Sequence, residues 1–112
     1  MRNCDIVIIG GGPAGLAAAI AAYDKGVKNI LILEREERTG GILNQCIHNG
    51  FGLTRFKESL SGPEYAARFI EEAEKRNIET LVGTTVLSLS KDKTITAINP
   101  TDGVFTVKAK AV

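Results

Sequence analysis

Three glycines have the clearest chemical meaning in this sequence, because Gly10, Gly12 and Gly15 are spaced as G-x-G-x-x-G. They follow a β-branched apolar run and open an Ala-rich segment, the context in which this spacing binds the pyrophosphate of a dinucleotide. Gly10 allows a sharp turn, Gly12 lets the backbone approach the phosphates, and Gly15 lets the helix pack closely on the strand. The phosphates would then lie at the helix N-terminus, beside Pro13 and Ala14, where unpaired N–H groups and the helix dipole favour negative charge.

An acidic residue, Glu34, ends the second apolar run about 20 residues further on, where a ribose-binding acid is expected. Its carboxylate can accept hydrogen bonds from both ribose hydroxyls of an adenosine. It would also repel a 2′-phosphate, which disfavours NADP, although Arg35 beside it weakens that point. The alternative is that the glycines make only a tight turn and Glu34 is a solvated strand end. We disfavour it because the strand, glycines, helix and acid all agree.

Three consecutive elements must bring these residues together. Residues 4–9 read C-D-I-V-I-I, a nearly continuous apolar run typical of a strand buried on both faces. Pro13 suits the first turn of a helix, and the Ala-rich segment after it predicts a helix that ends at Gly26. Residues 29–33, N-I-L-I-L, predict a second buried strand. Together they predict a βαβ unit with a right-handed crossover.

The next part of the chain begins with a long loop. Residues 35–62 lack a clear period, and a loop of this length in a compact domain is usually functional or disordered. The residues from Ser61 to Glu64 predict a helix start, and a short strand is expected over 80–83. Four residues at helical spacing form the apolar face of this helix: Ala66, Phe69, Ile70 and Ala73.

Residues 84–112 then change to short apolar runs separated by polar turns, at 86–89, 95–98 and 104–107. Such runs predict a three-stranded antiparallel β-meander. The predicted fold class is therefore α/β: a Rossmann-like βαβ unit with a parallel sheet, plus the β-meander. We divide the chain into a parallel core over about 1–83 and a meander over about 84–112, together one partial dinucleotide-binding domain.

Composition narrows the classes of function. The chain has 112 residues and a formal net charge of +1, enough for one small domain but with no basic face for nucleic acid. The longest early apolar stretch, 16–22, is far shorter than the ~20 residues of a membrane span. No targeting segment is recognised, so we expect a cytoplasmic protein. Cys4, Cys46 and a single histidine lack metal-ligand spacing, so we expect no metal site, and Cys4 is predicted to pack as a small hydrophobe.

The chain resembles the glutathione-reductase-like flavoproteins that have two dinucleotide-binding domains. The resemblance rests on residues 5–19 (D-I-V-I-I-G-G-G-P-A-G-L-A-A-A), residues 31–35 (L-I-L-E-R) and the pair Gly40-Gly41. It implies that the N-terminal site binds FAD, that Glu34 holds the adenosine ribose, and that Gly40 and Gly41 lie against the cofactor. It also implies an insertion that matches the predicted meander.

A narrower resemblance covers residues 40–52 and 61–69, which look like a bacterial subgroup of FAD-dependent oxidoreductases associated with glycerol-3-phosphate and sarcosine or amine oxidation. Disulfide reductases of the superfamily have two redox cysteines after the Gly-Gly pair. This chain has only Cys46 there, so disulfide reductase chemistry is not expected. The A-T-G-like turn and the second acidic Gly-Asp motif of the family are absent. The resemblance therefore implies an N-terminal fragment of a longer enzyme, inactive by itself.

Some side chains have two interpretations. Cys46 and His48 could approach the flavin or the substrate, as an adduct-forming thiolate and a general base, or could be a packed thiol and a loop-capping imidazole. Arg35 and Arg38 could contact the adenine or a phosphate, or be solvated loop charges. Residues 104–112 should form an exposed apolar sheet edge in this chain, so we predict that it self-associates there.

Our first interpretation is the FAD-binding part of an oxidoreductase that transfers a hydride or electrons from a small polar substrate, with NAD(P)H as a candidate partner. An NAD-binding Rossmann domain would use the same glycines and acid. FAD is favoured because the unit begins at the N-terminus and Gly40-Gly41 follows the acid. A third interpretation is an inactive truncated module that binds nothing or only an adenine nucleotide.

Overall fold

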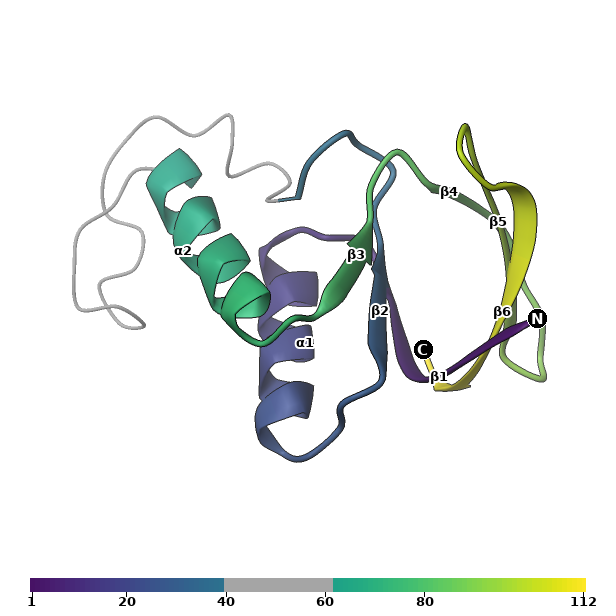
Figure 1. Cartoon of the computed structure of the whole chain (residues 1–112), viewed down its shortest axis with the longest axis horizontal. Coiled ribbons are helices and arrows are strands. Elements are labelled where there is room, and N and C mark those ends of the chain that lie inside the picture. Colours follow the sequence, from purple (N-terminus) through teal and green to yellow (C-terminus); the bar gives the residue numbers. More distant parts are fainter. Residues whose placement is uncertain (40–61) are drawn as a thin grey trace.

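A computed structural model describes residues 1–39 and 62–112 of the chain. Within these ranges it contains two helices and one six-stranded sheet, with the strand order β3-β2-β1-β6-β5-β4. Figure 1 shows the helices on one side of the central strands and the strands β4 to β6 on the other. The predicted α/β class, with parallel strands and an antiparallel meander in the same chain, is confirmed.

The N-terminal βαβ unit consists of β1 (Arg2–Ile9), α1 (Pro13–Asp24) and β2 (Ile30–Leu33). β1 and β2 pair in parallel, with Ile6 opposite Ile30 and Ile9 opposite Leu33. All four side chains of β2 are buried, as expected for a strand covered on both faces. α1 ends as predicted, because Gly26 adopts a φ of 105° that non-glycine residues avoid.

The helix α2 (Gly62–Lys75) leads into the short strand β3 (Glu79–Leu81), which pairs in parallel with β2. The predicted apolar face of α2 is confirmed, since Ala66, Phe69 and Ala73 are buried, and Phe69 and Ala73 pack against α1 and the sheet. The turn between α2 and β3 places Asn77 at a φ of 55°, in the left-handed region that Asn tolerates at a helix end. The helices thereby cover one face of the parallel strands.

The predicted meander is formed by β4 (Thr85–Leu89), β5 (Thr94–Asn99) and β6 (Gly103–Ala111), paired in antiparallel order. β6 has two partners. Residues 103–108 pair antiparallel with β5, and residues 107–111 pair parallel with β1, where Cys4 lies opposite Ala109. A single strand thus joins the meander to the parallel part of the sheet.

The prediction that the last apolar run forms an exposed sheet edge is wrong. In the part of the chain that the structure describes, the two edges of the sheet are β3 and β4, and β6 lies between β1 and β5. The last strand is not at the edge because β1 of the same chain pairs with it, so no later segment is needed to flank it. Self-association remains a prediction, but β6 does not provide its surface.

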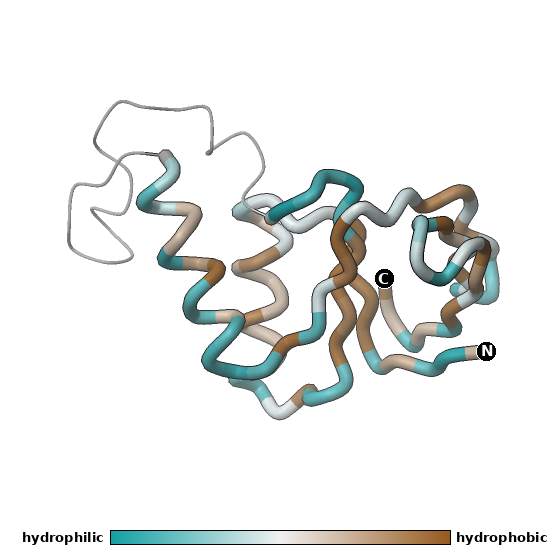
Figure 2. Tube along the Cα trace, turned by 45° about the horizontal axis from the view of Figure 1, so that its top comes forward, coloured by the Kyte–Doolittle hydropathy of each residue, from teal (hydrophilic) through white to brown (hydrophobic). Residues whose placement is uncertain are grey.

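The apolar core lies on both faces of the sheet, and the central strands are the most hydrophobic part of the trace in Figure 2. On one face, Ile30 and Ile32 pack against the helices together with Leu16 and Ile20. On the other face, side chains of the parallel strands and the meander form a second cluster: Cys4, Val7, Leu31, Leu33, Ile95, Val107 and Ala109. The packed Cys4 fits its prediction as a small hydrophobe. The two clusters fix the position of the loops at the carboxyl ends of the strands.

Candidate nucleotide-binding site

Three loops meet where the parallel strands end. They follow β1, β2 and β3 and are tied together by backbone hydrogen bonds. The N–H of Gly10 donates to the carbonyl oxygen of Leu33 at 2.8 Å, and the N–H of Glu34 donates to that of Leu81 at 2.9 Å. Because ligands of open α/β sheets bind beyond the carboxyl ends of the strands, this edge is the candidate site.

The three motif glycines differ in what they require. Gly10 has a φ of 106°, a conformation that L side chains rarely adopt. A Cβ atom on Gly15 would lie 2.0 Å from the carbonyl oxygen of Gly10, so only glycine permits this contact between α1 and the end of β1. Gly12 has an ordinary extended backbone, with φ −76° and ψ −175°, and a Cβ atom there would meet nothing within 4 Å. Gly10 and Gly15 are therefore needed by the fold, whereas Gly12 leaves space free.

The free space at Gly12 lies at the N-terminus of α1. Pro13 occupies the first helical turn, as predicted, and Leu16 donates its N–H to the carbonyl oxygen of Gly12 at 2.9 Å. Gly12 is the N-cap, where it provides no side-chain hydrogen bond, and the first turn contains no acidic residue. Ala14, in the same turn, is exposed. The first N–H groups of α1 thus face the candidate site without a side-chain cap.

Glu34 is buried at the centre of the three loops, with 7% of its surface exposed. Its Oε1 accepts a hydrogen bond from the N–H of Gly11 at 2.7 Å, and its Oε2 accepts one from the N–H of Glu36 at 2.7 Å. A carboxylate oxygen has more than one lone pair, so both oxygens keep acceptor capacity for further donors. The predicted ribose-binding acid therefore lies directly beside the glycine loop.

A polar network behind the site links it to the meander. The N–H of Thr84 donates to the carbonyl oxygen of Glu34 at 2.8 Å. The side chain of Asn99 donates to Thr84 Oγ1 and to Asp102 Oδ2, each at 3.1 Å, and accepts from the N–H of Asp102 at 2.6 Å. Thr84 and Asn99 are both buried, so the bond between them is shielded from water, whereas the two bonds to Asp102 are only partly buried. The β5–β6 turn thus supports the loop that contains Glu34.

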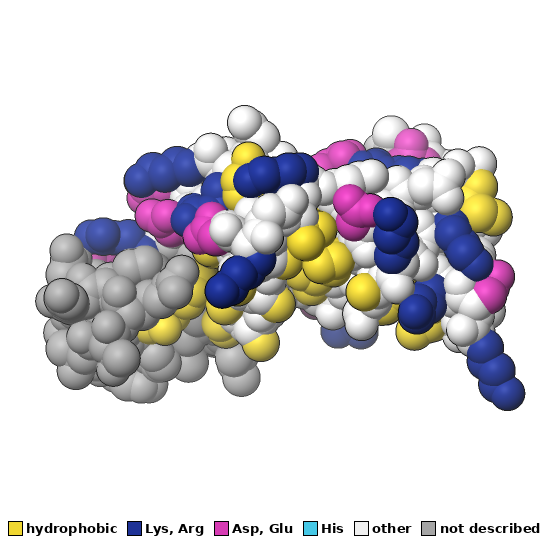
Figure 3. Space-filling view, turned by 90° about the horizontal axis from the view of Figure 1, so that it is seen from below, with side chains coloured by type: hydrophobic (Ala, Val, Ile, Leu, Met, Phe, Trp, Pro, Cys, Tyr) yellow, Lys and Arg dark blue, Asp and Glu magenta, His cyan; other side chains and the backbone are white. Residues whose placement is uncertain are grey.

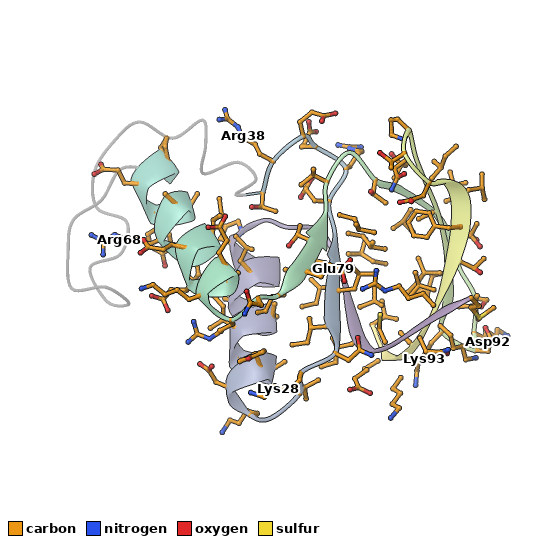
Figure 4. All side chains as sticks on the ribbon, viewed as in Figure 1. Lys28, Arg38, Arg68, Glu79, Asp92 and Lys93 are labelled. Atoms are coloured by element: carbon orange, nitrogen blue, oxygen red, sulfur yellow. The ribbon has the colours of Figure 1, made fainter. Side chains whose placement is uncertain are left out.

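The other predicted site residues are less well placed. Arg35 is exposed, with its guanidinium 3.8 Å from the carboxylate of Glu36. Arg38 is exposed and points away from the ribbon (Figure 4). It lines a hollow of about 400 Å³ between α2 and the loop after β2. The predicted residues Gly40, Gly41, Cys46 and His48 lie outside the described residues.

An ion pair closes the opposite, amino end of the parallel strands. The Arg2 guanidinium at the start of β1 binds the Glu79 carboxylate at the start of β3 through two contacts, of which Nη1–Oε2 is 2.9 Å. The hydrogen bonds from Arg2 lower the pKa of Glu79 and those to Glu79 raise the pKa of Arg2. Figure 3, which views the molecule from below Figure 1, shows basic and acidic side chains interspersed on that face.

Four residues near the site were not predicted from the sequence: Gly11, Thr39, Thr84 and Asn99. Thr39 is buried, and its methyl group lies against Gly11. No spacing in the sequence marks these positions as a set. In the folded chain Thr39 meets Gly11, and Asn99 is linked through Thr84 to the backbone of Glu34. Among residues 1–39 and 62–112, no group of three or more His, Cys, Asp or Glu side chains could hold a metal ion. In the same ranges, no helix has the length and apolar character needed to cross a bilayer.

Comparison with solved structures shows the fold. The bacillithiol disulfide reductase Bdr (YpdA) from Bacillus cereus superposes with a TM-score of 0.80 at 19% identity, over 97% of this chain and 38% of that one. L-proline dehydrogenase from P. horikoshii superposes with a TM-score of 0.78 at 20% identity, over 96% of this chain and 21% of that one.

Curated relatives and one protein family also match the sequence. Thioredoxin reductase of Ureaplasma parvum is 38% identical over 69% of this chain and 24% of its own length, and the human flavin-containing amine oxidase B is 47% identical over 36% of this chain and 8% of its own. The chain thus spans about a quarter or less of these relatives. Residues 4–112 match a family over almost the whole chain. The chain belongs to the pyridine nucleotide-disulphide oxidoreductase family.

Proposed function

We propose that this chain binds the adenosine and pyrophosphate portion of FAD, as the nucleotide-binding part of a flavin-dependent oxidoreductase. One observation carries the proposal: the free space at Gly12 and the buried Glu34 carboxylate lie on adjoining loops, joined by the 2.7 Å bond from Gly11 to Glu34. Family membership supports oxidoreductase function. The flavin-containing amine oxidase among the relatives supports FAD as the cofactor.

Different residues of the site bind different parts of the nucleotide. Gly12, which lacks a Cβ atom, leaves room for the pyrophosphate, and the first N–H groups of α1, beside Pro13 and Ala14, donate hydrogen bonds to its oxygens. The Glu34 carboxylate accepts hydrogen bonds from the ribose hydroxyls with its remaining lone pairs. Gly10 and Gly15 hold the turn that brings these groups together. The bound flavin supplies the electron transfer.

The predictions on further cofactor contacts, catalytic residues, substrate and partner concern the whole protein. We propose that Gly40 and Gly41 line the cofactor and that Arg35 lies near the adenosine. We also propose that Cys46 and His48 act near the flavin, that the substrate is small and polar, and that NAD(P)H is a partner. The subgroup associated with glycerol-3-phosphate and sarcosine oxidation remains our narrower proposal for the parent, although thioredoxin reductase is among the relatives.

The second candidate ligand is NAD. NAD is a pyridine nucleotide, and a soluble pyridine nucleotide transhydrogenase, from Mycobacterium bovis, is among the relatives. It is 46% identical over 45% of this chain and 10% of its own length. NAD has the same adenosine and pyrophosphate as FAD, so the glycine loop and Glu34 would serve both. Glu34 disfavours the 2′-phosphate of NADP in either case.

Equilibrium dialysis of this chain against FAD, ADP, FMN and NAD tests the proposal. We expect FAD and ADP to bind and compete with each other, and FMN, which lacks the adenosine and pyrophosphate, not to bind. The proposal would be overturned if FMN bound as tightly as FAD, or if neither FAD nor ADP bound. NAD binding that exceeds FAD binding would favour the second candidate.

A further inference from the structure

Gly11 is enclosed by two side chains from the loop after β2. A Cβ atom built on Gly11 would lie 2.6 Å from Cγ2 of Thr39 and 3.2 Å from Oε1 of Glu34. Its neighbours differ, since a Cβ atom on Gly10 or Gly12 would meet nothing within 4 Å. The middle residue of the Gly-Gly-Gly turn is therefore held by the protein, while the residues on either side face open space.

The two contacts hold Gly11 in different ways. Glu34 accepts the Gly11 N–H at 2.7 Å, which fixes the direction of the peptide. Thr39, 8% exposed, places its methyl group where a side chain of residue 11 would be. A Thr side chain is branched at Cβ and stiff at χ1, so this methyl group cannot turn aside without leaving a preferred rotamer. A hydrogen bond and a van der Waals contact thus act on one residue.

We infer that Thr39 is a positioning residue for the nucleotide, acting through Gly11. Its methyl group holds the Gly11 backbone against Glu34, and so keeps the N–H groups and the free space of the adjoining Gly12 in the geometry that receives a pyrophosphate. On this account Thr39, and not the dinucleotide, is what requires glycine at position 11. The inference rests on the proposed function for the identity of the ligand.

The steric part is tested by unfolding, without any ligand. Gly11→Ala should lower the thermal midpoint by at least about 4 °C, because the added methyl group overpacks the contact with Thr39. Thr39→Ser removes Cγ2 and keeps the hydroxyl, so the double variant Gly11→Ala/Thr39→Ser should regain more than half of that loss. Additive effects of the two substitutions would overturn the coupling.

The positioning part is tested by the affinity for FAD, with two variants at one site. Thr39→Val keeps the methyl group and loses the hydroxyl, and its FAD dissociation constant should stay within about twofold of the wild type. Thr39→Ser, which loosens Gly11, should raise the constant about five- to tenfold. Amide hydrogen exchange at Gly11 should quicken in Thr39→Ser and not in Thr39→Val.

The outcomes separate this inference from the proposed function. If the wild type binds FAD and Thr39→Ser binds it equally well, the positioning role is overturned and the proposed function stands. If Thr39→Val loses affinity as much as Thr39→Ser, the hydroxyl and not the methyl group is responsible, which also overturns the inference. If the wild type does not bind FAD, the proposed function fails and the positioning role fails with it, whatever the unfolding data show about Gly11.

Discussion

The backbone N–H of Gly11 donates a hydrogen bond of 2.7 Å to the side chain of Glu34, which joins the loop after β1 to the loop after β2. The other carboxylate oxygen of Glu34 accepts the N–H of Glu36 at the same distance. The predicted ribose-binding residue is therefore also a structural element of the free protein. Its position is set before any ligand arrives, which lowers the entropy cost of binding.

Replacing Glu34 should cost stability even in the absence of nucleotide. Glu34→Gln preserves the shape of the side chain but turns one acceptor into an N–H₂ donor, which then faces a backbone N–H of Gly11 or Glu36. A buried donor left without its acceptor costs about 1–3 kcal/mol, and the free energy of unfolding should fall by that amount. Denaturant unfolding measures it. Glu37→Gln, on the exposed part of the same loop, is the control and should change little.

Gly15 should not tolerate alanine, although alanine is the better helix former by about 1 kcal/mol. The added Cβ would lie 2.0 Å from the carbonyl oxygen of Gly10 and 3.2 Å from Cγ2 of Ile8, so α1 must move away from β1. We expect Gly15→Ala to destabilise the chain by about 1–3 kcal/mol in denaturant unfolding. A gain in stability from this substitution would show that α1 does not pack this closely.

The network behind the site predicts a pH-dependent defect. Asn99→Asp removes the donor to Thr84 and places a carboxylate against Asp102, whose Oδ2 is 3.1 Å from the present amide nitrogen. We expect a loss of about 1–3 kcal/mol near pH 7 that decreases as the pH falls toward about 4, because the close pair of carboxylates then shares a proton and the repulsion is relieved. Adding Asp102→Asn should recover part of the loss near pH 7. A defect that does not change between these pH values would contradict the repulsion.

The ion pair between Arg2 and Glu79 predicts a loss of stability in acid. Arg2 lowers the pKa of Glu79 in the folded state. The stabilisation is therefore fully present above the pKa of a glutamate in the unfolded chain, about 4.3, and is lost as the pH falls through the lower pKa of Glu79 in the folded protein. The side chains are 38% and 49% exposed, so the pair contributes up to about 1 kcal/mol. The difference in unfolding free energy between wild type and Glu79→Gln should therefore vanish in acid and diminish in high salt. Glu74→Gln, on the exposed face of α2, is the comparison and should change the unfolding free energy little.

Much of the fold could be predicted because local patterns and tertiary packing agree. The glycine spacing and the apolar run of β2 imply a strand, a turn and a helix in one order, and Gly26 ends α1 by a backbone conformation that favours glycine. The position of Glu34 beside the glycine loop could be predicted because this residue directly follows a fully buried strand.

The rest depended on contacts between distant segments. The position of β6 is set by which strand completes the parallel layer, and the apolar pattern of residues 104–112 is the same for an edge and for a central strand. Thr39 lies next to Gly11 only because two loops fold together, and no spacing in the sequence marks that contact. Such residues are found from packing and not from periodicity.

The affinity of Gly12→Ala for FAD, measured with its thermal stability, tests the central claim most directly. The backbone of Gly12 suits alanine, and a Cβ atom there would meet no protein atom within 4 Å. Alanine is a poorer N-cap than glycine but lowers the entropy of the unfolded chain. Because these two effects oppose each other, the free energy of unfolding should stay within about 1 kcal/mol of the wild type. If the pyrophosphate occupies this space, the dissociation constant for FAD should rise about tenfold or more, because the methyl group excludes it. A variant as stable as the wild type that binds FAD equally well would contradict the site.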